Sequence, residues 1–153
     1  MIKNVRTDYY LNFVKDDPVR PHLPTVWRIE PGREVYVLED DETNEVVAMI
    51  CVAFCNDIPV DEGELEKYST SVDKHSARGS NAIFYTVWSY KPGSGRTIVL
   101  GVAELIKNTM PNVTRFVTLS PMTDMARQFH LKNGASVLQV NSTSVNYEYK
   151  FNE

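Results

Sequence analysis

Apolar and polar residues follow one another along this chain in short runs, with one longer run of helical period. Runs that alternate or that are rich in Val, Ile, Phe and Tyr predict strands, whereas apolar residues spaced three and four apart predict helices. The clearest helix is predicted where apolar residues from Ile98 to Ile106 recur on one face and Pro111 ends the run. Strands are predicted at 34–39, 46–54, 81–88, 114–119, 136–140 and 144–151, and helices at 97–110 and 122–133, with weaker or shorter helices at 9–14 and 64–68.

The order of these elements predicts the architecture. The first two strands flank an acidic turn at 40–45 and are expected to form an antiparallel hairpin, and a polar, mobile loop is predicted at 69–79. Residues 81–119 read as strand, glycine turn, helix and strand, which implies a parallel, right-handed crossover. With 153 residues the chain can bury one core. We therefore expect an α/β (α+β) fold, a mixed central β-sheet flanked by helices, as a single domain over residues 1–153.

The charge distribution narrows the class of ligand. The net charge is −4, but residues 88–135 carry six basic and two acidic side chains. A basic segment within an acidic protein favours a small anionic ligand over nucleic acid, which requires a broader basic face. A chance imbalance on solvated surface is the alternative. No apolar run approaches the ~20 residues that span a bilayer, and the first eight residues lack a signal-peptide pattern. We expect a cytoplasmic protein with no membrane partner.

Cysteine and histidine spacing gives no indication of a disulfide or metal site. Cys51 and Cys55 lie four apart in a predicted strand. At ~3.3 Å per residue they are separated by roughly 13 Å, beyond the reach of a disulfide. They are expected to be buried free thiols in a reducing compartment. His22, His75 and His130 show no ligand-like spacing, so no metal is expected.

A glycine-rich turn precedes the longest predicted helix. It contains Lys91, Gly93, Ser94, Gly95, Arg96 and Thr97. The first turn of a helix has unpaired N–H groups and a positive dipole end, so this turn could bind a phosphate, with Arg96 and Lys91 as counter-charges. The alternative is an ordinary strand–helix loop that uses glycine for its backbone angles.

Two polar residues near the last predicted helix are candidates for catalysis. His130 lies one turn before Gly134, and histidine transfers protons because its pKa lies near neutrality. Alone, a helical histidine is more often a surface or satisfied core residue. Ser120 follows the strand at 114–119; its hydroxyl could form a hydrogen bond with a ligand, or cap the following helix with Pro121 at the first helical position.

These segments together resemble the GNAT superfamily of acyl-CoA-binding enzymes, and within it the catalytic domain of malonyl-CoA decarboxylases. The resemblance extends over residues 35–150 in order, although the decarboxylases carry a long insertion where residues 121–129 join two segments directly here. It rests on Ala82-Ile83-Phe84-Tyr85, Leu105-Ile106-Lys107, Thr118-Leu119-Ser120-Pro121, Phe129-His130-Leu131-Lys132-Asn133-Gly134-Ala135 and Val145-Asn146-Tyr147-Glu148-Tyr149.

The resemblance implies acetyl-CoA or malonyl-CoA as co-substrate, with its pyrophosphate on the turn at 91–97. It implies catalytic roles for Ser120 and His130, while a backbone N–H of the strand at 81–88 would polarise the thioester carbonyl. Phe84 and Tyr85 of that strand would lie against the cofactor. Tyr85, Tyr147 and Tyr149 are expected first as sheet packing, and Tyr147 is the one of them taken as a further catalytic candidate. Pairing of terminal strands between subunits would give a homodimer.

Three functions follow from the resemblance. Acyl transfer from acyl-CoA to an unidentified amine acceptor is the first expectation, because small GNAT domains are usually transferases. Decarboxylation of malonyl-CoA is the alternative. It needs no base to deprotonate an acceptor, and the strand at 81–88 contains no Asp or Glu. A non-catalytic acyl-CoA-binding or protein-interaction module is the third.

Overall fold

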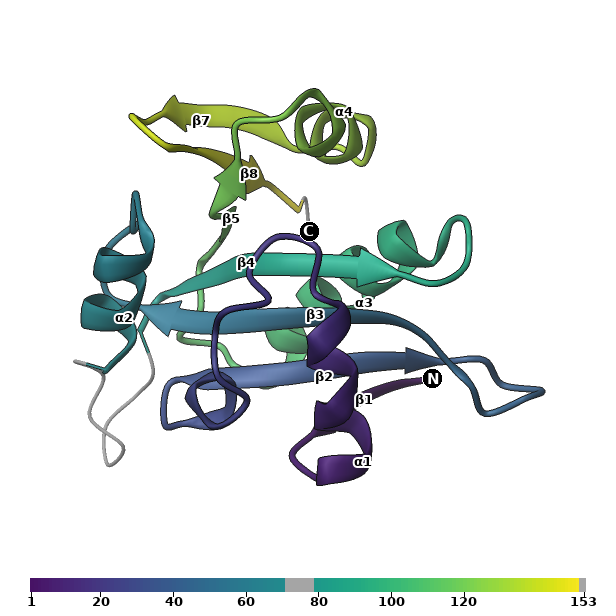
Figure 1. The fold of residues 1–153 in the computed structure, drawn as a ribbon. Helices are drawn as coiled ribbons and strands as arrows, with labels where there is room; N and C mark the ends of the chain where they lie inside the picture. Colours follow the sequence, from purple (N-terminus) through teal and green to yellow (C-terminus); the bar gives the residue numbers. More distant parts are fainter. Residues whose placement is uncertain (71–78, 152–153) are drawn as a thin grey trace.

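The computed structural model describes residues 1–70 and 79–151, which form a twisted sheet with helices on both faces (Figure 1). The helices are α1 (Asp8–Leu11), α2 (Glu62–Thr70), α3 (Ser94–Thr109) and α4 (Asp124–Lys132), with two 3₁₀ turns, η1 (Asn12–Asp16) and η2 (Val26–Ile29). The strands are β1 (Ile2–Val5), β2 (Arg33–Glu39), β3 (Val46–Cys55), β4 (Asn81–Ser89), β5 (Arg115–Thr118), β6 (Ser120–Pro121), β7 (Ser136–Val140) and β8 (Ser144–Tyr149).

The described strands form one mixed sheet in the order β1-β2-β3-β4-β5-β8-β6, with β7 added on β8. Only β4 and β5 are parallel, because α3 connects them; the other described pairs are antiparallel. The β2–β3 pair is the predicted hairpin, and the β4–α3–β5 unit is the predicted crossover. The expected fold class is therefore confirmed.

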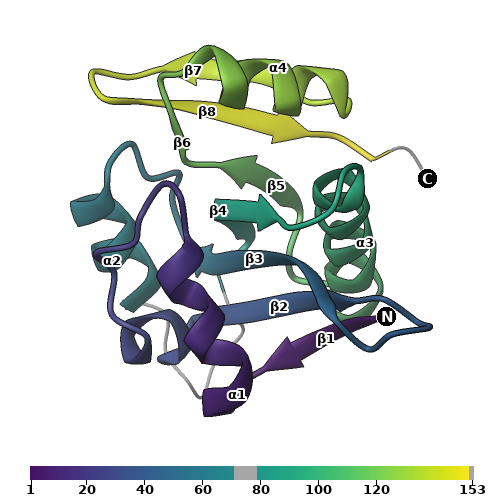
Figure 2. The same ribbon diagram turned by 45° about the vertical axis from the view of Figure 1, so that its right-hand side comes forward.

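Two layers of apolar side chains cover the two faces of this sheet. On one face α3 buries Ile98, Val102 and Ile106 against β3 and β4. On the other face the N-terminal segment and α2 pack on the alternate residues of β2, β3 and β4, including Cys51 and Cys55. Figure 2 shows α3 on one side of the sheet and α1 and α2 on the other. Strands covered on both faces explain the nearly continuous apolar sequence of β3.

The structure changes several predicted boundaries. The weak helix at 9–14 is the end of α1 followed by the 3₁₀ turn η1, and α2 extends from Glu62 to Thr70, so residue 69 is helical. The rest of the predicted loop, residues 71–78, lies outside the described residues. Strands β1 and β6 and the turn η2 were not predicted, since each has only two to four residues.

The predicted capping role of Ser120 is wrong. Ser120 and Pro121 form β6, which pairs with Ser144 and Val145 of β8. Thr123 is the N-cap of α4 instead, and its hydroxyl oxygen accepts a hydrogen bond from the Ala126 N–H at 3.2 Å. The side chain of Ser120 is thus not used at a helix end.

The structure places Cys51 and Cys55 as predicted within the fold, as buried thiols with no bridge between them. Burial raises the pKa of Cys51 to about 11 and that of Cys55 to about 12. Both sulfurs therefore remain thiols at neutral pH and behave as apolar packing groups.

Candidate active site

A cleft opens where strands β4 and β5 part. Their ladder runs from Asn81 opposite Arg115 to Phe84 opposite Thr118, and ends with Leu119 N–H donating to Phe84 O at 3.2 Å. Beyond this point β6 pairs with β8, whereas β4 continues to Ser89. Among the described strands, none therefore pairs with residues 85 to 89 of β4 on this side.

A β-bulge marks the start of this free edge. Cys51 pairs with Thr86 and the next residue, Val52, pairs with Phe84, so Tyr85 is an extra residue in β4. A bulge bends its strand and redirects the adjacent backbone groups. Here it lies at the point where the two strands begin to diverge.

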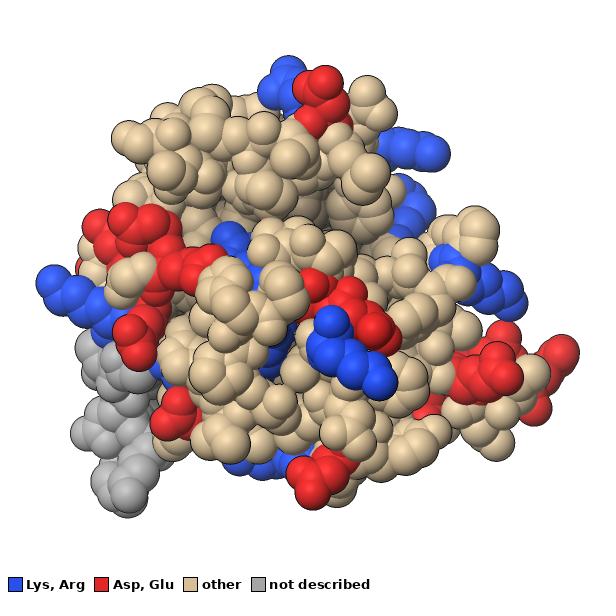
Figure 3. Space-filling view, in the orientation of Figure 1, with Lys and Arg blue, Asp and Glu red and all other residues tan. Residues whose placement is uncertain are grey.

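The cleft has a volume of about 630 Å³ and is lined mainly by apolar side chains. It runs from the first turn of α3 along β4 to β6 and the loop before η2, with α4 as its opposite wall. Its lining contains no Asp, Glu, Lys or Arg among the described residues. In Figure 3 the surface over β7 is tan, whereas charged side chains project outward from the region of α4. The lining residues are Pro18, Val19, Phe84, Tyr85, Thr86, Val87, Trp88, Ser89, Gly95, Leu119, Ser120, Pro121, Thr123, Met125, Ala126, Phe129 and His130.

His130 is the one histidine among these lining residues. Helix α4 places it beneath aromatic rings, so that only 5% of the residue is exposed. Its Nδ1 forms a 2.7 Å hydrogen bond with the hydroxyl of Tyr149, and its ring stacks on Tyr147 with centroids 5.2 Å apart. Because Nδ1 is occupied, Nε2 is the nitrogen left for a ligand in the cleft.

The surroundings of His130 change its expected chemistry. Burial lowers the pKa of this histidine to about 4, and no acidic residue in the described part of the chain compensates for it. The prediction that its pKa lies near neutrality is therefore wrong, because a sequence pattern does not show enclosure by apolar rings. The imidazole is neutral at pH 7. If the Tyr149 hydroxyl donates to Nδ1, then Nε2 carries the proton and acts as a hydrogen-bond donor.

Ser120 lies in the same cleft as His130. It is buried, and its hydroxyl donates a hydrogen bond to Thr118 Oγ1 at 2.7 Å. The same Thr118 oxygen accepts a second hydrogen bond from the Tyr147 N–H at 3.0 Å. Tyr147 does not line the cleft; its ring lies behind His130. The structure thus brings Ser120 and His130 to one cavity and gives Tyr147 a supporting position.

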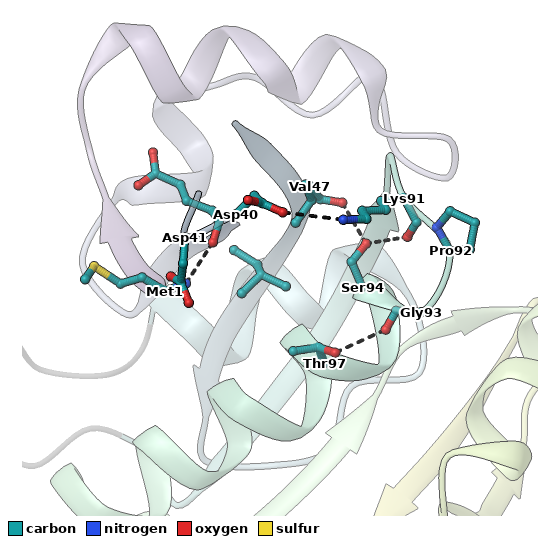
Figure 4. A pocket seen from close by; sticks show the side chains of 11 residues that line it. Met1, Asp40, Asp41, Val47, Lys91, Pro92, Gly93, Ser94 and Thr97 are labelled. Carbon is teal, nitrogen blue, oxygen red and sulfur yellow. Dashed lines mark hydrogen bonds and ion pairs between the residues drawn. The ribbon is translucent and has the colours of Figure 1, made fainter. Parts of the chain in front are cut away.

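The predicted phosphate-binding turn is divided between two cavities. Gly95 lines the cleft, where an added Cβ would lie 3.1 Å from the Phe129 ring. By contrast Lys91, Gly93, Ser94 and Thr97 line a separate cavity of about 400 Å³, shared with the acidic β2–β3 turn (Figure 4). Of these residues, only Gly95 thus lines the cleft that contains the histidine.

Side-chain bonds occupy most polar groups of that turn. Lys91 Nζ lies 3.4 Å from Asp40 Oδ2, and the Ser94 hydroxyl donates to the carbonyl oxygens of Val47 and Lys91. Gly93 has φ +83°, a left-handed conformation that suits glycine. Arg96 lines neither cavity, and its Nη1 donates to Asn133 Oδ1 at 3.2 Å.

Sequence reasoning missed two features of the site, a partner of His130 and part of the cleft wall. Tyr149, assigned to sheet packing, forms the hydrogen bond that fixes His130. Its spacing of two from Tyr147 places both rings on one face of β8, a period that could have indicated this pairing. The loop with Pro18 and Val19 also lines the cleft, but nothing in its sequence shows which strands it meets.

The described residues contain no cluster of His, Cys, Asp or Glu suited to a metal ion. Within the same part of the chain, no helix has the length and apolar content needed to cross a bilayer.

No protein-family model matches this sequence, and no curated protein matches it significantly. Similar solved structures include the GNAT-like decarboxylase GphF in complex with isobutyryl-CoA, with 14% identity, a TM-score of 0.70 and coverage of 97% of this chain and 98% of that one. AAC(6')-Ib in complex with ribostamycin and coenzyme A has 14% identity, a TM-score of 0.66 and coverage of 97% and 92%.

The malonyl-CoA decarboxylase from Agrobacterium vitis is similar over a smaller share of its length. It has 18% identity and a TM-score of 0.64, and the match covers 84% of this chain and 35% of the decarboxylase. This chain therefore spans about a third of that enzyme. At these identities the likeness concerns the fold, and the chain has the GNAT fold expected from its sequence.

Proposed function

We propose that this chain binds an acyl-CoA thioester in the cleft beside β4 and decarboxylates a malonyl-type acyl group. The observation that carries this proposal is the chemistry of the lining: it is apolar, contains no charged side chain among the described residues, and presents one neutral imidazole. This combination suits decarboxylation, in which uncharged CO₂ leaves a carboxylate and the remaining enolate then takes up one proton.

The ends of the cleft would orient the thioester. The first turn of α3, which reaches the cleft at Gly95, would offer backbone N–H groups to the pyrophosphate. The pantetheine arm would follow the free edge of β4, where unpaired backbone groups can bond its amides. The acyl group would then lie near the bulge at Tyr85, between Ser120 and His130.

The proposed reaction breaks the bond between the carboxylate carbon and the α-carbon of the malonyl group. The bonding electrons move into the thioester as an enolate and CO₂ leaves. An N–H donor of β4 would stabilise the enolate oxygen. A proton then bonds to the α-carbon, delivered from His130 Nε2 while the Tyr149 hydroxyl supplies Nδ1, and solvent restores the proton to Tyr149. An apolar cleft favours loss of the carboxylate charge.

Acyl transfer to an amine is the second candidate, supported by the similarity to AAC(6')-Ib over nearly the whole chain. Such transfer requires removal of a proton from an ammonium group. Among the described lining residues the available base is His130, whose low pKa makes it a weak one. The geometry therefore favours decarboxylation over the transfer expected from the sequence.

Product analysis separates the candidates. The protein would be incubated with malonyl-CoA, and with acetyl-CoA plus a panel of amines, while acetyl-CoA and free CoA are followed by mass spectrometry. Acetyl-CoA formed from malonyl-CoA, and lost in His130→Gln, supports the proposal. Free CoA that appears only with an amine supports transfer. Thioester binding without turnover would indicate a non-catalytic module and contradict both.

A further inference from the structure

A short loop of the N-terminal segment is inserted where β4 and β5 part. Asp17 and Arg20 form its two ends, and both are buried. Between them, Pro18 and Val19 line the cleft. We call residues 17–20 the wedge loop. No other described part of the first 80 residues reaches the cleft lining.

Arg20 bridges the two diverging strands. Its Nη1 donates to the Tyr85 carbonyl at the bulge, and its Nη2 donates to the Leu119 carbonyl at 3.0 Å. These two carbonyls belong to the strand positions directly after the last β4–β5 ladder bond. The guanidinium thus takes the place of the strand-to-strand bonds that are lost when the strands part.

Asp17 fixes the other end of the wedge loop. Its Oδ1 accepts the backbone N–H groups of Val19 and Arg20, both at 2.9 Å, and the hydroxyl of Thr86 in β4 at 2.8 Å. A carboxylate that bonds N–H groups two and three residues ahead makes a rigid Asx turn. Both ends of the loop are therefore tied to β4, and the residues between them cannot retreat without breaking buried bonds.

We propose that Val19 is a specificity-determining residue, which limits the size of the acyl group, and that Arg20 is a positioning residue, which holds Val19 in the cleft beside the bulge at Tyr85. This inference rests on the proposed binding of an acyl-CoA, since it assigns this part of the same cleft to the acyl chain. An added Cβ on Gly95 would lie 3.7 Å from the Ser89 hydroxyl, near the end of β4, whereas the wedge loop is bonded to Tyr85 and Thr86. A thioester anchored at α3 and extended along β4 therefore points its acyl group toward the wedge loop.

The physical consequence is a limit on chain length. A rigid, half-buried valine at a cleft end excludes added methylenes, and one methylene in an apolar pocket changes affinity by about 10-fold or more. Shortening Val19 should therefore admit longer acyl chains while leaving the α3 end of the site unchanged.

The test is a comparison of dissociation constants for acetyl-, butyryl- and hexanoyl-CoA, measured by calorimetry for the wild type, Val19→Ala and Val26→Ala. Val26 is an exposed valine in η2 outside the cleft, so its variant controls for a general effect of the substitution. We expect Val19→Ala to lower the hexanoyl-to-acetyl ratio of dissociation constants about 10-fold, with the acetyl-CoA value unchanged. Val26→Ala should retain the wild-type ratio.

The outcomes distinguish this inference from the proposed function. Equal ratios in wild type and Val19→Ala, with acetyl-CoA bound, would overturn the size limit and leave thioester binding intact. Absence of binding to every thioester would overturn both. Arg20→Lys, which keeps the charge but cannot span both carbonyls, should widen the acyl range in the same direction as Val19→Ala. A folded Arg20→Lys protein with a wild-type ratio would remove Arg20 from the positioning role.

Discussion

The ring of His130 is enclosed by the aromatic rings of Phe129, Tyr147 and Tyr149, and this enclosure determines its charge. Its ordinary pKa of 6.5 falls to about 4 because the charged form loses its hydration. The neutral imidazole can donate a hydrogen bond from one ring nitrogen and accept one at the other. It can therefore pass a proton to a ligand in the cleft without carrying a positive charge beforehand.

This shift of pKa predicts an acid-sensitive stability. Between pH 6.5 and pH 4 the unfolded chain binds a proton at His130 that the folded chain does not, so the free energy of unfolding decreases as the pH falls. Between pH 7 and pH 5 the loss should be about 2 kcal/mol. Urea unfolding of the wild type and His130→Gln at both pH values measures it, since the variant should lack this component. An equal pH dependence in the two proteins would contradict the low pKa.

Tyr147 and Tyr149 offer a matched test of the hydrogen bond to Nδ1. Tyr149→Phe removes the donor and should lower thioester turnover about 10-fold, the value of one neutral hydrogen bond. Tyr147→Phe keeps the ring that stacks on His130 and should leave turnover nearly unchanged. The ¹⁵N shifts of the imidazole give a readout independent of activity: they should change in Tyr149→Phe alone. A larger effect in Tyr147→Phe would restore Tyr147 as a catalytic residue.

At the scale of elements, periodicity in the sequence was sufficient for the long segments. Strand β4 and helix α3 lie within three residues of their predicted bounds, because each carries a full apolar face. Short elements gave no such period: β6 has two residues and exists because β8 pairs with it. The cleft depends on that pairing, since β6 leads the chain away from β4. The sequence therefore indicated which residue types belong to the site, but it could not indicate which segments form the walls of the cleft.

The approach of α3 to α4 provides a test at the element scale. Gly95 lets the first turn of α3 pass close to Phe129, and an added Cβ would lie 3.1 Å from its ring at the cleft end. Gly95→Ala should weaken binding of acetyl-CoA about 10-fold, because the added methyl group crowds the end of the cleft. The higher helix propensity of Ala should offset part of the folding strain that this contact causes. Gly63→Ala in α2 is the control, because its Cβ would make only an ordinary contact at 3.4 Å with Asp61. Unchanged affinity in Gly95→Ala would remove α3 from the binding site.

At the scale of the whole molecule, the N-terminal segment joins the cleft to the sheet face opposite α3. Figures 1 and 2 show the chain leaving the sheet after β1, crossing the face of β2–β4 and returning to the sheet at β2. Inside it, Arg28 donates to Asp17 Oδ2 at 2.8 Å and to the Arg20 carbonyl at 2.6 Å, and the side chains of Asp17 and Arg28 are fully buried. The wedge loop and the packing of the segment therefore depend on the same ion pair.

Removal of the charge at Asp17 tests this dependence. Asp17→Asn leaves the buried guanidinium of Arg28 without its anion and should lower the free energy of unfolding by about 3 kcal/mol at pH 7, the lower end of the cost of breaking a buried pair. Burial acts to raise the pKa of Asp17, but hydrogen bonds from the Arg20 backbone N–H and from Arg28 hold it below its usual value. The contribution of this ion pair therefore persists at neutral pH and is lost only as acid protonates the carboxylate.

Urea unfolding followed by tryptophan fluorescence measures this change, because Trp27 lies in the segment and Trp88 in β4. Glu30→Gln is the control: its ion pair with Arg33, at 3.3 Å, is half exposed on the glutamate side and should contribute less than about 1 kcal/mol. Since the wedge loop forms the inner wall of the cleft, Asp17→Asn should also widen the acyl range as Val19→Ala does. If Asp17→Asn were no less stable than Glu30→Gln and bound the same thioesters as the wild type, the segment would cover the sheet without shaping the cleft.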